Sequence, residues 1–202
     1  TLTMWVANPN GLTDTLSSDD TVTIVMSGGV SGAYTVGDTI GGANDFASIN
    51  EAILFLDSVG AVCDTTYIYL EASIIWNEQF VLSPLLNMSE TAPIIFTTKI
   101  GAAGKGTITH NPSSKRSENY TVQFGTNASY YIFDNLNIYS GSGSSTPYLT
   151  VLGFEDGASN NTVTNCNLST KVTSYFSTTN YAAIVSNRFN GNTNPDNDNN
   201  SF

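Results

Sequence analysis

Three carboxylates are the residues of this chain whose types and spacing come nearest to a catalytic set. Enzymes that cleave polysaccharides use a pair of carboxylic acids, or carboxylates that hold Ca²⁺ beside a base that takes a proton. The candidates are Asp134, Glu155 and Asp156. Thr164 stands where a thirty-residue repeat would align with Asp134, so we expect no column of carboxylates. We predict that the chain is not an enzyme, with a polysaccharide lyase or glycoside hydrolase as the alternative.

The histidine and the nearest cations offer little further chemistry. His110, the one histidine of the sequence, lies in the turn-like segment 109–112, and we interpret it as a surface turn residue. Lys115 and Arg116 lie in a polar loop, where solvation is their ordinary state. The sequence therefore predicts no catalytic residue.

One segment has the alternating oxygen donors of a calcium loop. Asp196, Asp198 and Asn200 alternate with Asn197 and Asn199, which also carry side-chain oxygens. An EF-hand loop also needs an internal glycine and a terminal glutamate, and this segment has neither. We predict a solvated turn, no metal site and no cofactor, with Ca²⁺ binding as the weaker alternative.

Five aromatic residues point to another kind of site, in which rings stack on sugars. They are Tyr130, Tyr139, Tyr148, Tyr175 and Phe176. On one exposed strip they would form a glycan-binding surface, whereas turned inward they are ordinary core residues. Glycan binding is therefore a function to test beside catalysis.

The two cysteines do not form a disulfide framework. Cys63 and Cys166 lie about three repeats apart, too far for the Cα separation of about 7 Å that a disulfide allows. Cys166 replaces Leu136 in the repeat, so it is expected to be a small inward-facing apolar residue.

Composition narrows the class of protein. The formal net charge is −11, and only 11% of residues are charged. Binding to nucleic acid needs a basic stripe, which six scattered Lys and Arg residues do not form. No run of about 18 apolar residues would insert into a membrane. The polarity comes from Thr, Ser, Asn and Gly, which is typical of extracellular and cell-surface proteins.

One helix is predicted, over residues 45–59. Asp45 is the expected N-cap and Gly60 the expected stop. Apolar residues from Phe46 to Leu56 recur at helical spacing and leave a wide apolar face. Such a helix must pack against something large and apolar, and we expect it to cap the start of the domain that follows.

After Gly60 the sequence becomes a series of short strands that repeat. The segment 122–138 aligns with 152–168 without a gap. Apolar residues at similar intervals extend the series in both directions, in the order Leu70, Phe96, Phe124, Phe154 and Ile184. Repeats of this length made only of strands and turns fit a coil of parallel strands. The predicted fold is all-β, a right-handed parallel β-helix of about five rungs that is open at its C-terminal end.

The repeat also predicts which side chains face inward. The inward residues of two successive rungs are Tyr131, Phe133, Leu136 and Ile138, then Asn161, Val163, Cys166 and Leu168. Asn135 and Asn165 occupy matching positions at a bend. Stacked asparagines form amide ladders, so we expect their side chains to bond to each other.

The first thirty residues differ from the rest. Two alternating runs, 1–7 and 21–26, flank a turn and an acidic loop, which predicts two paired strands. We divide the chain into a strand pair with a Gly-rich junction, residues 1–30, and the N-terminal part of a β-helix, residues 31–202. The pair resembles the last strands of an immunoglobulin-like domain, and a donor-strand segment is the alternative.

Several segments resemble a known family. Residues 32–37 and 45–53, the stretch Tyr67–Phe80 and the segment 128–136 resemble right-handed parallel β-helix domains, of the pectate-lyase-like superfamily fold, in large secreted surface proteins of the Bacteroidetes type. The resemblance covers roughly residues 32–190. It implies export by type IX secretion and O-glycosylation at Asp-Ser/Thr motifs. The matching candidate sites are Thr15, Thr21, Thr39, Ser58 and Thr65.

The predicted function is that of a structural or adhesive segment of a secreted bacterial cell-surface protein. Its expected partners are other segments of the same protein, identical subunits, or surface glycans. One alternative is a subunit of an extracellular filament assembled by β-strand addition, because strands at both ends would accept a partner. Another is a β-helix that cleaves or binds polysaccharides.

Overall fold

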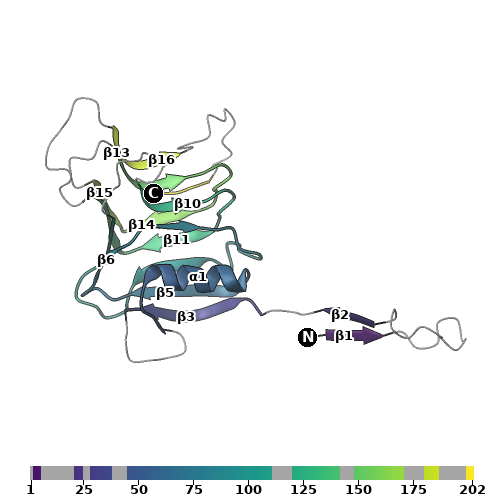
Figure 1. Cartoon of the computed structure of the whole chain (residues 1–202). Helices are drawn as coiled ribbons and strands as arrows, with labels where there is room; N and C mark the ends of the chain where they lie inside the picture. Colours follow the sequence, from purple (N-terminus) through teal and green to yellow (C-terminus); the bar gives the residue numbers. More distant parts are fainter. Residues whose placement is uncertain are drawn as a thin grey trace, which may run out of the picture.

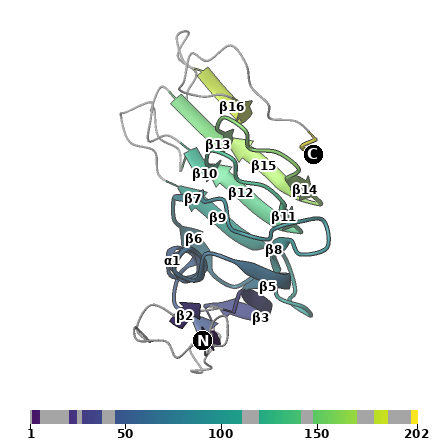
Figure 2. The same ribbon diagram turned by 90° about the vertical axis from the view of Figure 1, so that its right-hand side faces the viewer.

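A computed structural model describes residues 2–5, 21–24, 28–37, 45–110, 120–141, 148–170, 180–186 and 199–202. Its main body is a parallel β-coil of about four turns. Figures 1 and 2 show the strands stacked from β3 near the lower end to β16 at the upper end, with α1 near the lower end. The fold class is therefore confirmed, with about four turns in place of the expected five.

Three parallel sheets form the walls of the coil. The chain visits them in the same order on each turn. Sheet 1 contains β4 (Asp45–Phe46), β3 (Val30–Val36), β5 (Val62–Leu70), β8 (Ile94–Thr98), β11 (Tyr131–Asp134) and β14 (Thr162–Thr164). Sheet 2 contains β6 (Ile75–Asn77), β9 (Gly106–His110), β12 (Leu136–Ser140) and β15 (Asn167–Thr170). Sheet 3 contains β7 (Phe80–Leu82), β10 (Tyr120–Phe124), β13 (Tyr148–Phe154) and β16 (Asn180–Ser186).

The thirty-residue repeat is the register of the upper turns. Phe133 pairs with Val163, and Asn137 pairs with Asn167. Elsewhere the spacing changes, because the connections between strands differ in length. Three expected alignments are therefore wrong: Leu70 pairs with Thr98, Phe96 pairs with Phe133, and Phe154 pairs with Ser186.

The interior is filled by the predicted inward residues. Tyr131, Phe133, Leu136 and Ile138 are at most 1% exposed, and Asn161 is also fully buried. Val163 is buried, whereas Cys166 and Leu168 are half-buried on the uppermost turn. Burying side chains of this size contributes about 1.5–3 kcal/mol each, so these columns contribute strongly to holding the turns together.

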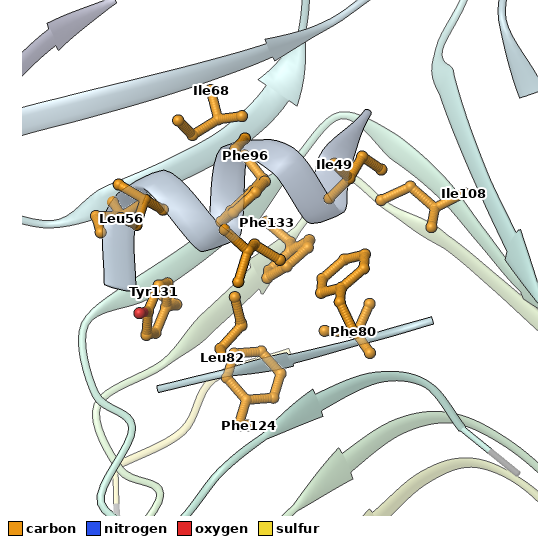
Figure 3. Packing of buried hydrophobic residues seen from close by; sticks show 14 of the residues in the cluster. Ile49, Leu56, Ile68, Phe80, Leu82, Phe96, Ile108, Phe124, Tyr131 and Phe133 are labelled. Carbon is orange, nitrogen blue, oxygen red and sulfur yellow. The ribbon is translucent and has the colours of Figure 1, made fainter. Parts of the chain in front are cut away.

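Aromatic rings stack from one turn to the next inside the coil. The ring centroids of Phe96 and Phe133 are 5.0 Å apart, and those of Phe124 and Phe154 are 4.4 Å apart. Figure 3 shows Phe96, Phe124 and Phe133 in one cluster with Ile49 and Leu56 of the helix. The inner face is therefore one continuous core and not a set of separate turns.

The helix α1 (Ile49–Val59) begins later than the sequence predicted. Its N-cap is Ser48, whose Oγ accepts a hydrogen bond from the backbone N–H of Glu51 at 3.0 Å. Asp45 instead belongs to β4, which pairs with β3. Ser48 and Glu51 have the spacing of a capping box, which is a stronger helix start than a single Asp. Gly60 ends the helix as predicted, with a φ of 71°.

A glutamate from the coil holds the start of α1. The carboxylate of Glu78 accepts hydrogen bonds from the backbone N–H groups of Ile49 and Asn50, at 3.1 and 2.8 Å. It also accepts one from the Asn50 side-chain amide at 2.7 Å. A negative charge at a helix N-terminus satisfies free N–H groups and interacts favourably with the helix dipole. This contact fixes the helix across the lower end of the coil, as the capping role predicted.

The two ends of the chain form short pairings. β1 (Leu2–Trp5) and β2 (Thr21–Ile24) are antiparallel, which confirms the predicted strand pair. At the upper end, Ser201 forms a parallel bridge to Thr162, so the last described residues lie along β14. The division into residues 1–30 and 31–202 stays a prediction.

Candidate functional site

A groove of about 270 Å³ lies at the corner where the chain passes from sheet 3 to sheet 1. It extends over successive turns, because its walls come from the segments that precede β8, β11 and β14. The lining residues are Glu90, Pro93, Tyr130, Ile132, Asn160, Thr162 and Asn199. The groove thus combines one aromatic ring and aliphatic surface with a carboxylate, amides and hydroxyls.

Three of the lining residues share an unusual backbone conformation. Tyr130, Asn160 and Asn199 have φ values of 59°, 56° and 58°, in the left-handed region. Asparagine tolerates this region, but a bulky tyrosine there is an outlier. A residue held in such a region costs about 1–3 kcal/mol and often marks a functional position. Tyr130 is therefore the strained residue at a corner where the other two turns have asparagine.

Two asparagines behind the groove, the buried Asn161 and the half-buried Asn200, hold its wall in place. Asn161 Oδ1 accepts a hydrogen bond from the Tyr131 N–H at 3.0 Å, and Asn161 Nδ2 donates to the Ala128 carbonyl at 3.0 Å. One turn higher, Asn200 Oδ1 accepts from the Asn161 N–H at 2.9 Å, and its Nδ2 donates to the Ala158 carbonyl. Each amide joins two turns, so the groove has a rigid floor.

Some polar groups of the groove already have hydrogen-bond partners in the protein, and others do not. The Thr162 hydroxyl lies 3.1 Å from the Ser201 hydroxyl, and Asn160 Nδ2 is 3.4 Å from the Ser159 hydroxyl. Within the described residues, the Glu90 carboxylate and the Tyr130 hydroxyl have no hydrogen-bond partner. These two groups are available to a ligand.

The outer face of sheet 1 continues the apolar side of the groove downwards. Tyr67, Ile95, Ile132 and Thr162 stand in register on β5, β8, β11 and β14. Tyr67 stacks on Tyr69, with ring centroids 5.6 Å apart and planes 7° apart. Ile95 and Ile132 are half-exposed. An aromatic and aliphatic strip therefore leads along the coil towards the groove.

The three candidate catalytic carboxylates are not gathered into one site. Asp134 ends β11 and accepts a hydrogen bond from Asn165 Nδ2 at 2.8 Å. Glu155 and Asp156 lie in the turn before β14, at the opposite end of the sheet 1 strands. In the described ranges, no three His, Cys, Asp or Glu residues are placed to hold a metal ion. Asp196 and Asp198 lie outside the described residues.

His110 is not a surface turn residue. It is the last residue of β9, half-buried, in register beside the fully buried Ser140 of β12. Burial lowers the pKa of the His110 imidazole from 6.5. The reason for the wrong prediction is that β9 continues the strand alternation up to the turn signal at Asn111 and Pro112. Lys115 and Arg116 lie outside the described residues.

An asparagine ladder exists, but not where it was expected. Asn135 and Asn165 mark a bend, with φ values of 54° and 52°, and the Asn165 amide bonds to Asp134 instead. The ladder runs two residues further on. Asn167 Nδ2 donates to Asn137 Oδ1 at 2.8 Å, and the Asn137 amide reaches the Thr107 hydroxyl at 3.2 Å. At the bend the amides meet a carboxylate, whereas in the strand they stack directly.

The five aromatic residues do not form one strip. Tyr130 lies at the groove beside sheet 1, whereas Tyr139 lies on β12 of sheet 2. Tyr148 is on β13, but its side chain is outside the description, as are Tyr175 and Phe176. The aromatic partners on sheet 1 are Tyr67 and Tyr69, which the sequence analysis missed. Their i, i+2 spacing in a strand was the signal that would have placed them on one face.

The candidate O-glycosylation sites are spread over several elements. Ser58 is exposed on α1, where its hydroxyl donates to the Phe55 carbonyl at 2.7 Å. Thr65 is half-buried on β5, and its hydroxyl lies 3.5 Å from the Thr91 carbonyl. Thr21 begins β2. Thr15 and Thr39 lie outside the described residues, and modification at all five stays a prediction.

Both cysteines are free, as predicted. Cys63 is exposed, and its Sγ accepts a hydrogen bond from the Gly29 N–H at 3.0 Å. Cys166 is half-buried at an inward position, and burial raises the pKa of its thiol. It therefore behaves as the small apolar residue that the repeat indicated.

Comparison with known proteins found no relative of this chain. No protein-family model, curated protein or solved structure matched this chain. In the described residues, no helix has the length and apolar character that crossing a membrane requires. The geometry of the coil and of its groove is thus the basis for any functional conclusion.

Proposed function

We propose that this chain is a non-enzymatic structural and adhesive segment of a secreted bacterial cell-surface protein. The observation that carries the proposal is the continuous stacking of about four turns on one apolar core. A coil in which every turn is bonded to its neighbours through three sheets resists bending and stretching. It can hold a binding surface at a distance from the place where the protein is anchored.

Two features of the coil support a mechanical role. The interior columns of aromatic and aliphatic residues run parallel to the coil axis, so neighbouring turns cannot slide without opening the core. The outer amide ladder through Thr107, Asn137 and Asn167 adds bonds in the same direction. A short Asn or Thr side chain can pair with its equivalent one turn away, whereas a column of like charges would repel. The low charge content of the chain fits this arrangement.

A filament assembled head to tail is less well supported. α1 covers the lower end of the coil, and Glu78 holds it there. Another coil could stack on sheets 2 and 3 at that end only by displacing the helix. We therefore favour a segment that works beside other segments of the same protein.

Single-molecule stretching tests the mechanical proposal. The whole chain, tethered by its two ends, should extend in one abrupt step at high force. A Phe133→Ala variant should unfold at clearly lower force, and Ile132→Ala, the neighbouring residue on the outer face, should behave like the parent. Gradual extension of the parent at low force would overturn the structural role.

The enzyme alternative has its own experiment. The chain is incubated with neutral and acidic polysaccharides, with and without Ca²⁺, and new reducing ends or unsaturated products are measured. We expect no turnover. Turnover that is abolished by Asp134→Ala or Asp156→Ala would show that the chain is a polysaccharide-cleaving enzyme and would overturn the proposal.

A further inference from the structure

We propose that the groove beside Tyr130 binds a neutral oligosaccharide, which would supply the ligand for the adhesive segment proposed above. The inference rests on that function for its biological sense, but its physical basis is the groove alone. The argument has four parts, which concern shape, chemistry, charge and backbone strain.

The size of the groove suits a short stretch of a sugar chain. Its volume is about 270 Å³, just below the range of about 300–1,000 Å³ that is usual for small-molecule sites. It lies on the side of the coil and continues into the apolar strip of Tyr67 and Ile95 on sheet 1. A longer ligand can therefore lie along the coil with one part seated in the groove.

The lining matches the two surfaces of a sugar ring. A pyranose has apolar C–H faces and a rim of hydroxyl groups. The Tyr130 ring, with Pro93 and Ile132, offers flat apolar contact. The Glu90 carboxylate accepts hydrogen bonds, and the Tyr130 hydroxyl can donate or accept one. Polar groups placed around an apolar contact surface are typical of a site that orients its ligand.

The charge of the groove and of the chain favours neutral ligands over acidic ones. The described residues that line the groove include one acid, Glu90, and no base. The whole chain carries a formal net charge of −11. Like charges disfavour association, so sulfated or uronic-acid glycans and free phosphates are poor ligands. The ligand class that remains is a neutral oligosaccharide.

Backbone strain at Tyr130 is the independent observation. On the two following turns this corner is built with asparagine, at Asn160 and Asn199, in the same left-handed conformation. Folding alone would be served equally well by asparagine at position 130. The aromatic ring is the one property that tyrosine adds, and it lines the groove.

Titration of oligosaccharides into the whole chain tests the inference. Gluco-, manno-, xylo- and chito-oligosaccharides serve as neutral probes, with oligogalacturonate and sulfated oligosaccharides as acidic probes, measured by calorimetry or by NMR chemical shifts. The test variant is Tyr130→Asn, because the corner accepts asparagine on the turns above. The matched control is Tyr139→Asn, the same change on sheet 2.

We expect at least one neutral probe to bind and the acidic probes not to bind. Tyr130→Asn should weaken binding by about tenfold, which corresponds to about 1.4 kcal/mol, while Tyr139→Asn stays within about twofold of the parent. Absence of neutral binding, preference for acidic probes, or full binding by Tyr130→Asn would each overturn the inference. The stretching experiment does not depend on glycan. A chain that resists stretching but binds no oligosaccharide would refute the proposed site and leave the proposed structural role intact.

Discussion

Opposite faces of the same strands of sheet 1 are filled in different ways. On the inner face of β5, β8, β11 and β14 stand Ile68, Phe96, Phe133 and Val163, which are 0–5% exposed. On the outer face the same strands present Tyr67, Ile95, Ile132 and Thr162. These include apolar residues that the core does not require. The comparison teaches that residues one apart in the sequence can serve folding on the inner face and the proposed glycan binding on the outer face.

The largest effect is expected from the inner face. Phe133→Ala removes a ring stacked on Phe96 and should lower the free energy of unfolding by about 3–5 kcal/mol, because it leaves a cavity in a close-packed interior. Ile132→Ala on the outer face should cost about 1 kcal/mol or less. Urea denaturation of both variants measures the difference. Equal losses would mean that the two faces contribute alike and would break the comparison.

The lower end of the coil offers the next largest effect. Glu78→Gln removes the charge that binds the first N–H groups of α1 and should cost about 1–2 kcal/mol. Glu90→Gln, the same change at the groove, should cost less than about 0.5 kcal/mol, since Glu90 is exposed. Thermal unfolding followed by circular dichroism compares them. A larger loss for Glu90→Gln would show that the groove is a structural element.

At the groove itself, stability should not suffer. Tyr130→Asn exchanges a strained tyrosine for the residue that the neighbouring turns use, so the free energy of unfolding should stay equal or rise by up to about 1 kcal/mol. Tyr139→Asn, on a strand with ordinary backbone geometry, should lower it slightly. The measurement is again urea denaturation. A clear loss for Tyr130→Asn would assign the ring to the core and remove the strain argument.

The smallest effect concerns pH and His110, at the margin of the interior. Burial lowers the pKa of His110 in the folded chain below 6.5. Between this lowered pKa of the folded chain and the value of 6.5 in the unfolded chain, the unfolded chain binds more protons, so unfolding becomes easier as pH falls. The contribution is complete above the unfolded pKa and is lost as pH falls through it. His110→Gln should flatten the stability curve at pH values below 6.5; an unchanged curve would contradict burial of the imidazole.

Sequence reasoning succeeded where the physical signal was local. Strand alternation has a period of two, so residues such as Phe133 and Ile138 were assigned correctly to the inner face. The left-handed stop at Gly60 was likewise predicted from one residue type. The start of the helix was misplaced at Asp45, because the capping-box spacing of Ser48 and Glu51, which is a stronger signal than a single Asp, was not used.

The sequence repeat did not predict the strand register between turns of different length. Phe96 was aligned with Phe124, but it pairs with Phe133, because the connection 99–105 between β8 and β9 is longer than its counterpart between β11 and β12, which is the single residue Asn135. Nothing in the segment around Phe96 indicates how far away its partner lies. The same limit hid the role of Glu78, whose hydrogen-bond donors lie on a helix about thirty residues earlier.

By itself, the sequence determined the parallel coil, its inward columns, the paired N-terminal strands and the helix that covers the lower end. The tertiary structure alone decided the groove, because Glu90, Tyr130 and Asn160 come from three connections between strands and Asn199 comes from the segment 199–202, which the register of sheet 1 brings together. Period and composition are properties of neighbouring residues, whereas a binding surface on a coil depends on which turns lie beside each other. That depends on the length of every connection and on the packing that selects one register.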